Sequence, residues 1–202
     1  MDITSVILDT TDPATAEAFY AALGLRDRVR LRPAGAPSSG FRGFTLSLVV
    51  SRPATVDAFV AAAAKAGAEV LKQPAKSLWG YGGSFRAPDG SAWTVASSSK
   101  KNNGEPDLAF DDLVLLLGVD DVKASKQFYT EHGLEVGKSF GGKYAEFETA
   151  GIKLAVQPRR AAAKNAGVDA AGSGSHGITI VGDAGAFTDP DGFVWETTDG
   201  VG

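Results

Sequence analysis

An internal repeat constrains the fold of this chain more than any other feature of its sequence. The segment from Phe85 to Trp93 and the segment from Phe187 to Trp195 both read Phe, two residues, Pro-Asp-Gly, two residues, Trp. An earlier pair of segments, 12–20 and 121–129, shares an Asp at its start and Phe-Tyr at its end. Because two blocks recur in the same order, we predict that the chain contains two related halves.

The two copies differ in what lies between these blocks. A third matching pair, 40–46 and 174–180, lies between these blocks. The second copy is longer than the first on the N-terminal side of this pair, and its additional residues 143–156 predict two strands. After this pair the second copy is shorter, because nothing in it matches the alanine-rich helix predicted at 55–66. One copy therefore lacks a hairpin and the other lacks a helix.

A polar segment separates the copies. Residues 99–106 read Ser-Lys-Lys-Asn-Asn-Gly-Glu-Pro and carry no apolar periodicity. We therefore predict a first half at 1–98, a linker at 99–106 and a second half at 107–202. A length of 202 residues allows one large domain or two small ones, at roughly 100–200 residues per domain, and the repeat favours two.

Each half is predicted to begin with a strand that leads into an Asp-capped helix, which ends at Gly24 or Gly133. Segment 44–97 then predicts one strand, one helix and three strands. Segment 113–156 predicts the same βαβββ unit, and the pieces at 3–31 and 178–198 predict truncated versions of it. The predicted order is partial, complete, complete, partial.

The composition excludes several functional classes. The chain has no cysteine, which excludes disulfides, thiolate metal sites and a cysteine nucleophile. A net charge of −4 argues against a nucleic-acid partner, and no apolar run reaches the roughly 20 residues of a membrane-spanning helix. The first residues lead directly into a strand without signal-peptide features, so we expect a cytoplasmic protein whose partner is a small molecule.

The repeated blocks resemble one known superfamily. A strand, then Asp-x-x-x-Ala-x-x-Phe-Tyr at 12–20, Leu-Gly-Leu at 23–25 and Asp-Pro-Asp-Gly-x-x-Trp-Glu at 189–196 are similar to the vicinal oxygen chelate superfamily. This group contains glyoxalases, extradiol dioxygenases and bleomycin-resistance-type binding proteins. The resemblance covers nearly the whole chain. It implies an α+β fold in which repeated βαβββ modules, two complete and two truncated here, form curled mixed sheets around a cleft.

The metal enzymes of that superfamily carry His and Glu ligands on strands that face the cleft. In this sequence, the corresponding positions are occupied by Ser5, Val114, Gly43, Gly177, Lys153, Thr94 and Glu196. Among these residues, only Glu196 is of a type that commonly binds a divalent metal, and such a metal usually takes three or four nitrogen or oxygen ligands. We therefore expect the fold without its metal cofactor.

An alternative is a displaced site in which one divalent metal is held around Glu196, with His176 and Asp112 as further ligands. His176 also reads as an acid or base in the cleft, or as a polar residue at the start of a strand. Glu196 also reads as a general base or as a surface carboxylate of an edge strand. His176 and Glu196 are the only candidates for catalysis, and the sequence shows no further residues that would act together with either of them in a catalytic site.

An aromatic cluster is a better candidate for ligand binding. Trp79-Gly-Tyr81-Gly-Gly-Ser-Phe85 places three rings in a glycine-rich segment, and large rings beside open backbone suit a planar ligand. Phe85 and Trp93 have counterparts in the other copy and are predicted to close the core. Trp79 and Tyr81 have no counterparts, so we predict that they line a pocket in which Arg42 and His176 orient polar groups.

Two basic segments have simpler interpretations. Arg26, Arg28, Arg30 and Arg32 alternate with other residues, which places four guanidinium groups on one face of a strand. Such a face attracts an anionic ligand or protects a charged edge strand from pairing with another sheet. Residues 159–164, followed by the Gly/Ala/Ser-rich stretch 166–175, predict a mobile, solvated loop.

The sequence thus predicts a glyoxalase-like or bleomycin-resistance-like protein that has lost its metal site. It would bind a small aromatic or amphipathic molecule, as in sequestration of an antibiotic or a metabolite. The alternative is a metal-dependent lyase, isomerase or dioxygenase of the same superfamily with a displaced site around Glu196. Truncated modules expose strand edges, so a homodimer is a further expectation.

Overall fold

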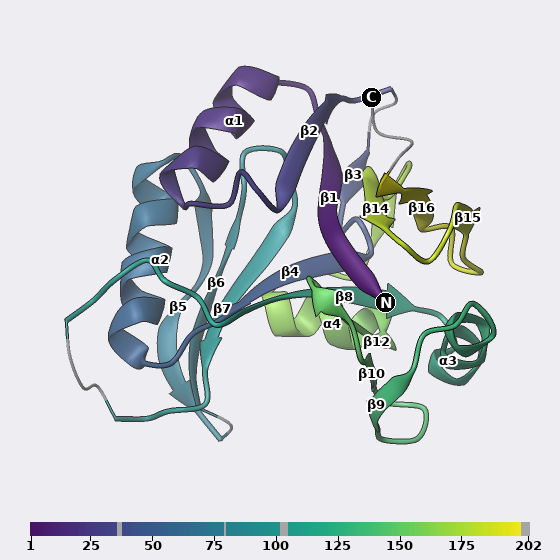
Figure 1. Cartoon of the computed structure of the whole chain (residues 1–202). Coiled ribbons are helices and arrows are strands. Elements are labelled where there is room, and N and C mark those ends of the chain that lie inside the picture. Colours follow the sequence, from purple (N-terminus) through teal and green to yellow (C-terminus); the bar gives the residue numbers. More distant parts are fainter. Residues whose placement is uncertain (36–37, 79, 102–104, 199–202) are drawn as a thin grey trace.

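The computed structural model describes residues 1–35, 38–78, 80–101 and 105–198, which form two large sheets, one two-stranded sheet and four helices (Figure 1). The larger sheet has eight strands in the order β5 (Glu69–Ser77), β6 (Gly80–Arg86), β7 (Ala92–Ser97), β4 (Phe44–Val49), β8 (Asp112–Val119), β12 (Lys153–Pro158), β10 (Ala145–Phe147) and β9 (Val136–Ser139). The second sheet has six strands: β11 (Ala150–Gly151), β1 (Asp2–Thr10), β14 (Ile178–Gly182), β16 (Val194–Thr197) and β15 (Phe187–Thr188), with β2 (Val29–Pro33) also paired to β1. Two short strands, β3 (Ser39–Gly40) and β13 (Gly172–Ser173), pair separately.

Both large sheets combine strands from the two predicted halves. In the eight-stranded sheet, β4 and β8 form an antiparallel pair. This pair joins the strands around α2 (Pro53–Lys65) to the strands around α3 (Val122–Glu131) in one continuous sheet. In the six-stranded sheet, β1 pairs with β14 in the same sense. Each sheet contains both parallel and antiparallel pairs. The predicted α+β fold with curled mixed sheets is confirmed.

Helices α1 (Pro13–Ala22) and α3 begin and end where the sequence predicts. Asp12 caps α1 by accepting a hydrogen bond from the Thr15 amide, and Asp121 caps α3 in the same way through the amides of Lys123 and Ala124. Gly24 and Gly133 follow these helices with φ of 70° and 87°, the left-handed conformation that glycine adopts without strain. No helix in the described ranges is both long and apolar enough to cross a membrane.

The repeated sequence blocks contact each other within each half. The Tyr20 hydroxyl on α1 donates to Asp89 of the first Pro-Asp-Gly turn at 2.6 Å. The Tyr129 hydroxyl on α3 donates to Asp189, just before the second turn, at 2.5 Å. Burial, together with these carboxylates, raises the pKa of both tyrosines well above the ordinary value. The repeat therefore encodes a buried contact between a helix and a turn.

The rings of these blocks form the core, as predicted. Phe85 and Trp93 are fully buried and stacked with centroids 6.2 Å apart, and Phe187 and Trp195 stack at 5.2 Å. The edge-strand prediction is also confirmed in part. Among the described strands, β2 pairs only with β1 and carries Arg30 and Arg32 on one face, whereas Arg26 precedes the strand and contacts Glu17.

The prediction of a loop at 159–164 is wrong, because residues Arg159–Ala166 form helix α4. Three alanines at helical spacing, Ala162, Ala163 and Ala166, make a narrow apolar stripe that packs against Phe41 and Ala92. This helix lies on the opposite face of the eight-stranded sheet from α2, beside β4 and β8 (Figure 1). Small side chains gave too weak a hydrophobic signal to identify the helix from sequence.

Removing the tyrosine hydroxyls tests the contact between the repeated blocks. We expect Tyr20→Phe and Tyr129→Phe each to lower the free energy of unfolding by about 1.5–3 kcal/mol, because each removes one hydrogen-bond donor from a buried carboxylate. Urea denaturation measures the effect. Tyr144→Phe is the control, since its hydroxyl donates to the less buried Glu146 and we expect a smaller loss. Equal losses in all three variants would contradict this interpretation.

Candidate functional site

Three of the positions that correspond to metal ligands, Val114, Lys153 and Thr94, lie in one row across the eight-stranded sheet, which also includes Ser47. Lys153 pairs with Val114, Val114 pairs with Ser47, and Ser47 pairs with Thr94. Their neighbours along the strands, such as Leu46 and Trp93, enter the core, so the row faces the same side as α4. Thr94 donates to Ser47 at 2.8 Å, and the Lys153 ammonium donates to the Thr149 carbonyl. The row contains no carboxylate or imidazole.

The six-stranded sheet carries a second row of the same kind. Ser5 on β1 pairs with Val181 on β14, and Val181 pairs with Glu196 on β16. Ser5 and Val181 are buried, whereas Glu196 is half-buried. Glu196 is therefore the single ligand-type side chain of this row.

The donor set does not fit a divalent metal at either row. Hydroxyls, an ammonium group and a valine offer no anionic or imidazole ligand, and one carboxylate is too few. The residues of the displaced metal site are not brought together either. Asp112 lies in the eight-stranded sheet, where it pairs with Val49. Glu196 lies in the six-stranded sheet and pairs with Val181 near the end of β14, whereas His176 precedes that strand. Within the described part of the chain, no three His, Asp or Glu side chains gather as a metal site would require.

Arg42 lies at the junction between the two sheets and is almost completely buried. Its Nη1 lies 3.3 Å from the Asp89 carboxylate and donates to the Asp89 carbonyl at 2.9 Å. Its Nε donates to the His176 carbonyl at 2.7 Å, and its Nη2 donates to the Gly177 carbonyl. The guanidinium group therefore joins the first Pro-Asp-Gly turn to the segment that enters β14.

His176 makes the reciprocal contacts. Its Nδ1 lies 2.6 Å from the Arg42 carbonyl, and its Nε2 lies 2.9 Å from the carbonyl of Asp191 in the second Pro-Asp-Gly turn. The ring stacks on Phe193 with a centroid distance of 4.0 Å. Arg42 and His176 occupy equivalent repeat positions, and each side chain binds the other residue's main chain and one turn. The structure thus brings these two predicted residues together, and their role toward a ligand stays a prediction.

The two predicted aromatic residues have separate outcomes. Tyr81 lies on β6, on the side of the sheet that faces α2, and its hydroxyl donates to Asp57 at 2.8 Å. It is half-buried, and its role in ligand binding stays a prediction. Trp79 lies outside the described residues.

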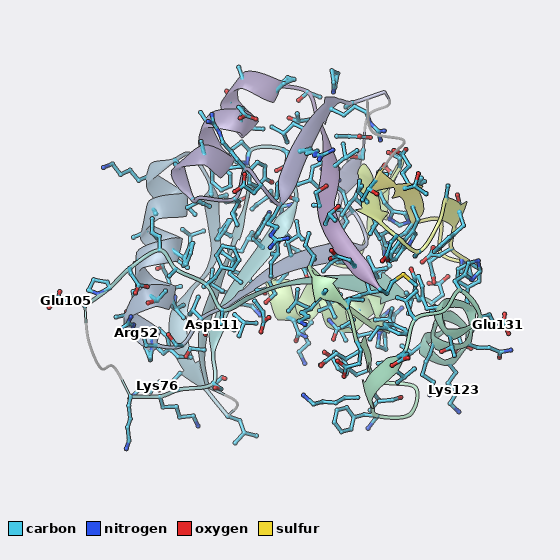
Figure 2. The ribbon with its side chains drawn as sticks, in the orientation of Figure 1. Arg52, Lys76, Glu105, Asp111, Lys123 and Glu131 are labelled. Atoms are coloured by element: carbon cyan, nitrogen blue, oxygen red, sulfur yellow. The ribbon has the colours of Figure 1, made fainter. Side chains whose placement is uncertain are left out.

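A hollow of about 530 Å³ opens on the other side of β6, the side that carries α4. Its floor is backbone and small side chains of β6 and β7, including Gly82, Gly83 and Ala96. β5 forms one wall, with Lys76 at its outer end, and Asn165 at the end of α4 forms the other. Figure 2 shows Lys76 at the opposite end of the molecule from Lys123 and Glu131 of α3.

Helix α4 determines where this hollow lies. It covers the centre of the sheet face, over β4, β8, β12 and the Ala92 end of β7, and leaves β5, β6 and the rest of β7 open. Ser84 donates to the Ala166 carbonyl at 2.6 Å, and Lys72 donates to the carbonyls of Lys164 and Asn165 at 2.7 and 3.0 Å. These donors form hydrogen bonds with the free carbonyls at the C-terminal end of the helix and hold this end beside the hollow.

Sequence reasoning missed the residues that line this hollow. The available signal was the pair Gly82-Gly83 inside a predicted strand, since glycine in a strand often marks close approach of another group. The sequence identifies Thr94 only as the counterpart of a metal ligand, although it lines the hollow. The alternation of the strand places it on the open face together with Ala96.

Replacing Arg42 tests whether it holds the junction. We expect Arg42→Met to lower the free energy of unfolding by about 3–5 kcal/mol, because it leaves the buried Asp89 carboxylate unpaired. Arg86→Met is the control, since Arg86 pairs with the exposed Glu69 and we expect a loss of about 1 kcal/mol or less. Chemical denaturation compares the two. A small loss for Arg42→Met would show that the junction does not depend on this charge.

Comparison with known proteins shows which solved structures have a similar fold. No protein-family model matches the sequence, and no curated protein matches it significantly. A solved Bacillus subtilis structure, named as a dioxygenase, superposes with a TM-score of 0.64 at 14% identity over 98% of this chain and 84% of that chain. Glyoxalase I from Zea mays superposes with a TM-score of 0.61 at 14% identity over 97% and 91%. The chain has the fold of the vicinal oxygen chelate superfamily.

Proposed function

We propose that this protein binds a small amphipathic molecule, without a metal ion, in the hollow over β5, β6 and β7. The observation that carries the proposal is the hollow itself. It has about 530 Å³ of space on the sheet face where the superfamily resemblance predicts a cleft, and none of the equivalent ligand positions of that sheet holds a metal ligand. Such a volume suits a drug-sized ligand.

The floor of the hollow favours a flat, apolar group. Gly82 and Gly83 present bare backbone, and the exposed Ala96 adds a small apolar side chain. A planar ring laid on this floor meets no projecting side chain from the two glycines. Burial of its apolar area supplies the main favourable free energy of binding.

The rim of the hollow favours a polar or anionic group on the same molecule. Lys76 contributes an exposed ammonium, and Gln73, Thr94 and Asn165 contribute amide and hydroxyl groups. A few polar groups around an apolar floor orient a ligand and give specificity. In this proposal the protein holds its ligand and neither forms nor breaks a bond in it.

Filling the hollow tests the proposal directly. Anilinonaphthalene sulfonate, an aromatic anion, is a suitable first probe, and its fluorescence reports binding. We expect Ala96→Trp to weaken binding about tenfold or more, because the indole occupies the floor and excludes the apolar contact. Ala96 is exposed, so the variant should retain its stability.

The matched control is Ala18→Trp, an exposed alanine on α1 that does not line the hollow. Tyr81→Phe separates the two faces of β6: unchanged binding supports the hollow, whereas a loss would support the aromatic pocket predicted from sequence. If the probe binds Ala96→Trp as well as the unsubstituted protein, this location is wrong.

Elemental analysis separates the proposal from a metal-dependent lyase, isomerase or dioxygenase. We expect protein purified without chelators to contain far less than one equivalent of Fe, Zn, Ni or Mn, because the donor set at both rows is inadequate. A thermal-shift scan of divalent metals accompanies the analysis. One bound equivalent that is lost in Glu196→Gln and retained in Glu148→Gln would establish a metal site around Glu196 instead.

A further inference from the structure

We infer a second site, one for a small oxyanion, between Arg42, Arg159 and the segment 170–176. These parts of the chain enclose a hollow of about 290 Å³ that shares no lining residue with the one over β5 to β7. Phe41 and Arg42 precede β4, Arg159 begins α4, and the third wall includes β13. The ligand class follows from the charges, the available donors and the polarity of the walls.

Arg159 is held in place by main-chain carbonyls. Its Nε donates to the Ala170 carbonyl at 3.1 Å and its Nη2 donates to the Phe41 carbonyl at 2.5 Å, while the guanidinium lies 5.2 Å from the centroid of the Phe41 ring. No carboxylate of the described residues lies within ion-pairing distance of it. Its position is therefore fixed while its charge lacks an anionic partner.

The remaining donor of Arg159, its Nη1, lies near the imidazole of His176. The Arg159 Nη1 and the His176 Nδ1 lie 2.5 and 2.8 Å from the point where a Cβ on Gly43 would stand. The guanidinium groups of Arg42 and Arg159 thus both line the hollow. Asp89 forms an ion pair with Arg42 and balances its charge, which leaves the positive charge of Arg159. Charges withdrawn from water are normally paired, so this positive excess favours an anion.

The walls limit the ligand to a small, polar one. Gly172, Ser173, Gly174 and Ser175 form much of the lining, and their exposed backbone and hydroxyl groups offer hydrogen bonds and little apolar surface. A guanidinium group with open N–H donors binds carboxylate and phosphate oxygens with charge-assisted hydrogen bonds. The geometry therefore favours a phosphate or carboxylate group over an apolar molecule.

Calorimetry with inorganic phosphate and with malonate tests this site, with sodium chloride at matched ionic strength as the reference. We expect either or both oxyanions to bind and to raise the melting temperature beyond the effect of chloride. Arg159→Gln should weaken binding about tenfold or more, because it removes the unpaired charge. The two ligands also distinguish a phosphate site from a carboxylate site.

Arg160→Gln is the matched control, because Arg160 is the next residue of α4, is exposed and does not line the hollow. Ser175→Glu is a second variant that keeps Arg159 and adds a negative charge at the wall, and it should also abolish binding. The inference is overturned if neither oxyanion stabilises the protein more than chloride does, or if Arg160→Gln weakens binding as much as Arg159→Gln.

Discussion

The buried contact of Arg42 with Asp89 and with the main chain around His176 is the interaction on which the arrangement of this protein depends. Arg42 precedes β4, the strand at the centre of the eight-stranded sheet, and His176 precedes β14, a central strand of the other sheet. Each side chain binds the carbonyl of the other residue. The guanidinium is removed from water and is satisfied by acceptors from three segments, so a shift of any one segment would leave buried polar groups unpaired.

This junction fixes the two sheets, and α4 then determines which surface remains open. The row of Lys153, Val114, Ser47 and Thr94 lies on the face of the eight-stranded sheet that carries α4, and it contains no metal-ligand side chain. The chain's own helix packs on that face, and the remaining space lies to one side, over glycine backbone. The same fold therefore presents a hollow suited to holding a molecule.

Much of this fold could be predicted from sequence because the repeat carries strong, local signals. The caps at Asp12 and Asp121, the left-handed glycines after the helices and the buried rings of Phe85 and Trp93 each follow from residue type and spacing. The site was less predictable. Alanines at 162, 163 and 166 resemble a loop in composition, and the hollow forms only when α4 reaches β7 across the sheet. The repeat position points to Arg42, yet its four carbonyl acceptors belong to distant segments, at Asp9, Asp89, His176 and Gly177, and leave no trace in the local sequence.

The alanine cluster beneath α4 is separate from the main core. Ala162, Ala163 and Ala166 contact Phe41 and Ala92, whereas the large rings of both halves belong to the other cluster. Substitutions in this second cluster can raise or tilt α4 without opening a void among the large rings. The shape of the proposed binding surface thus depends on other residues than the packing of the large rings, so substitutions can change that surface while the main core stays the same.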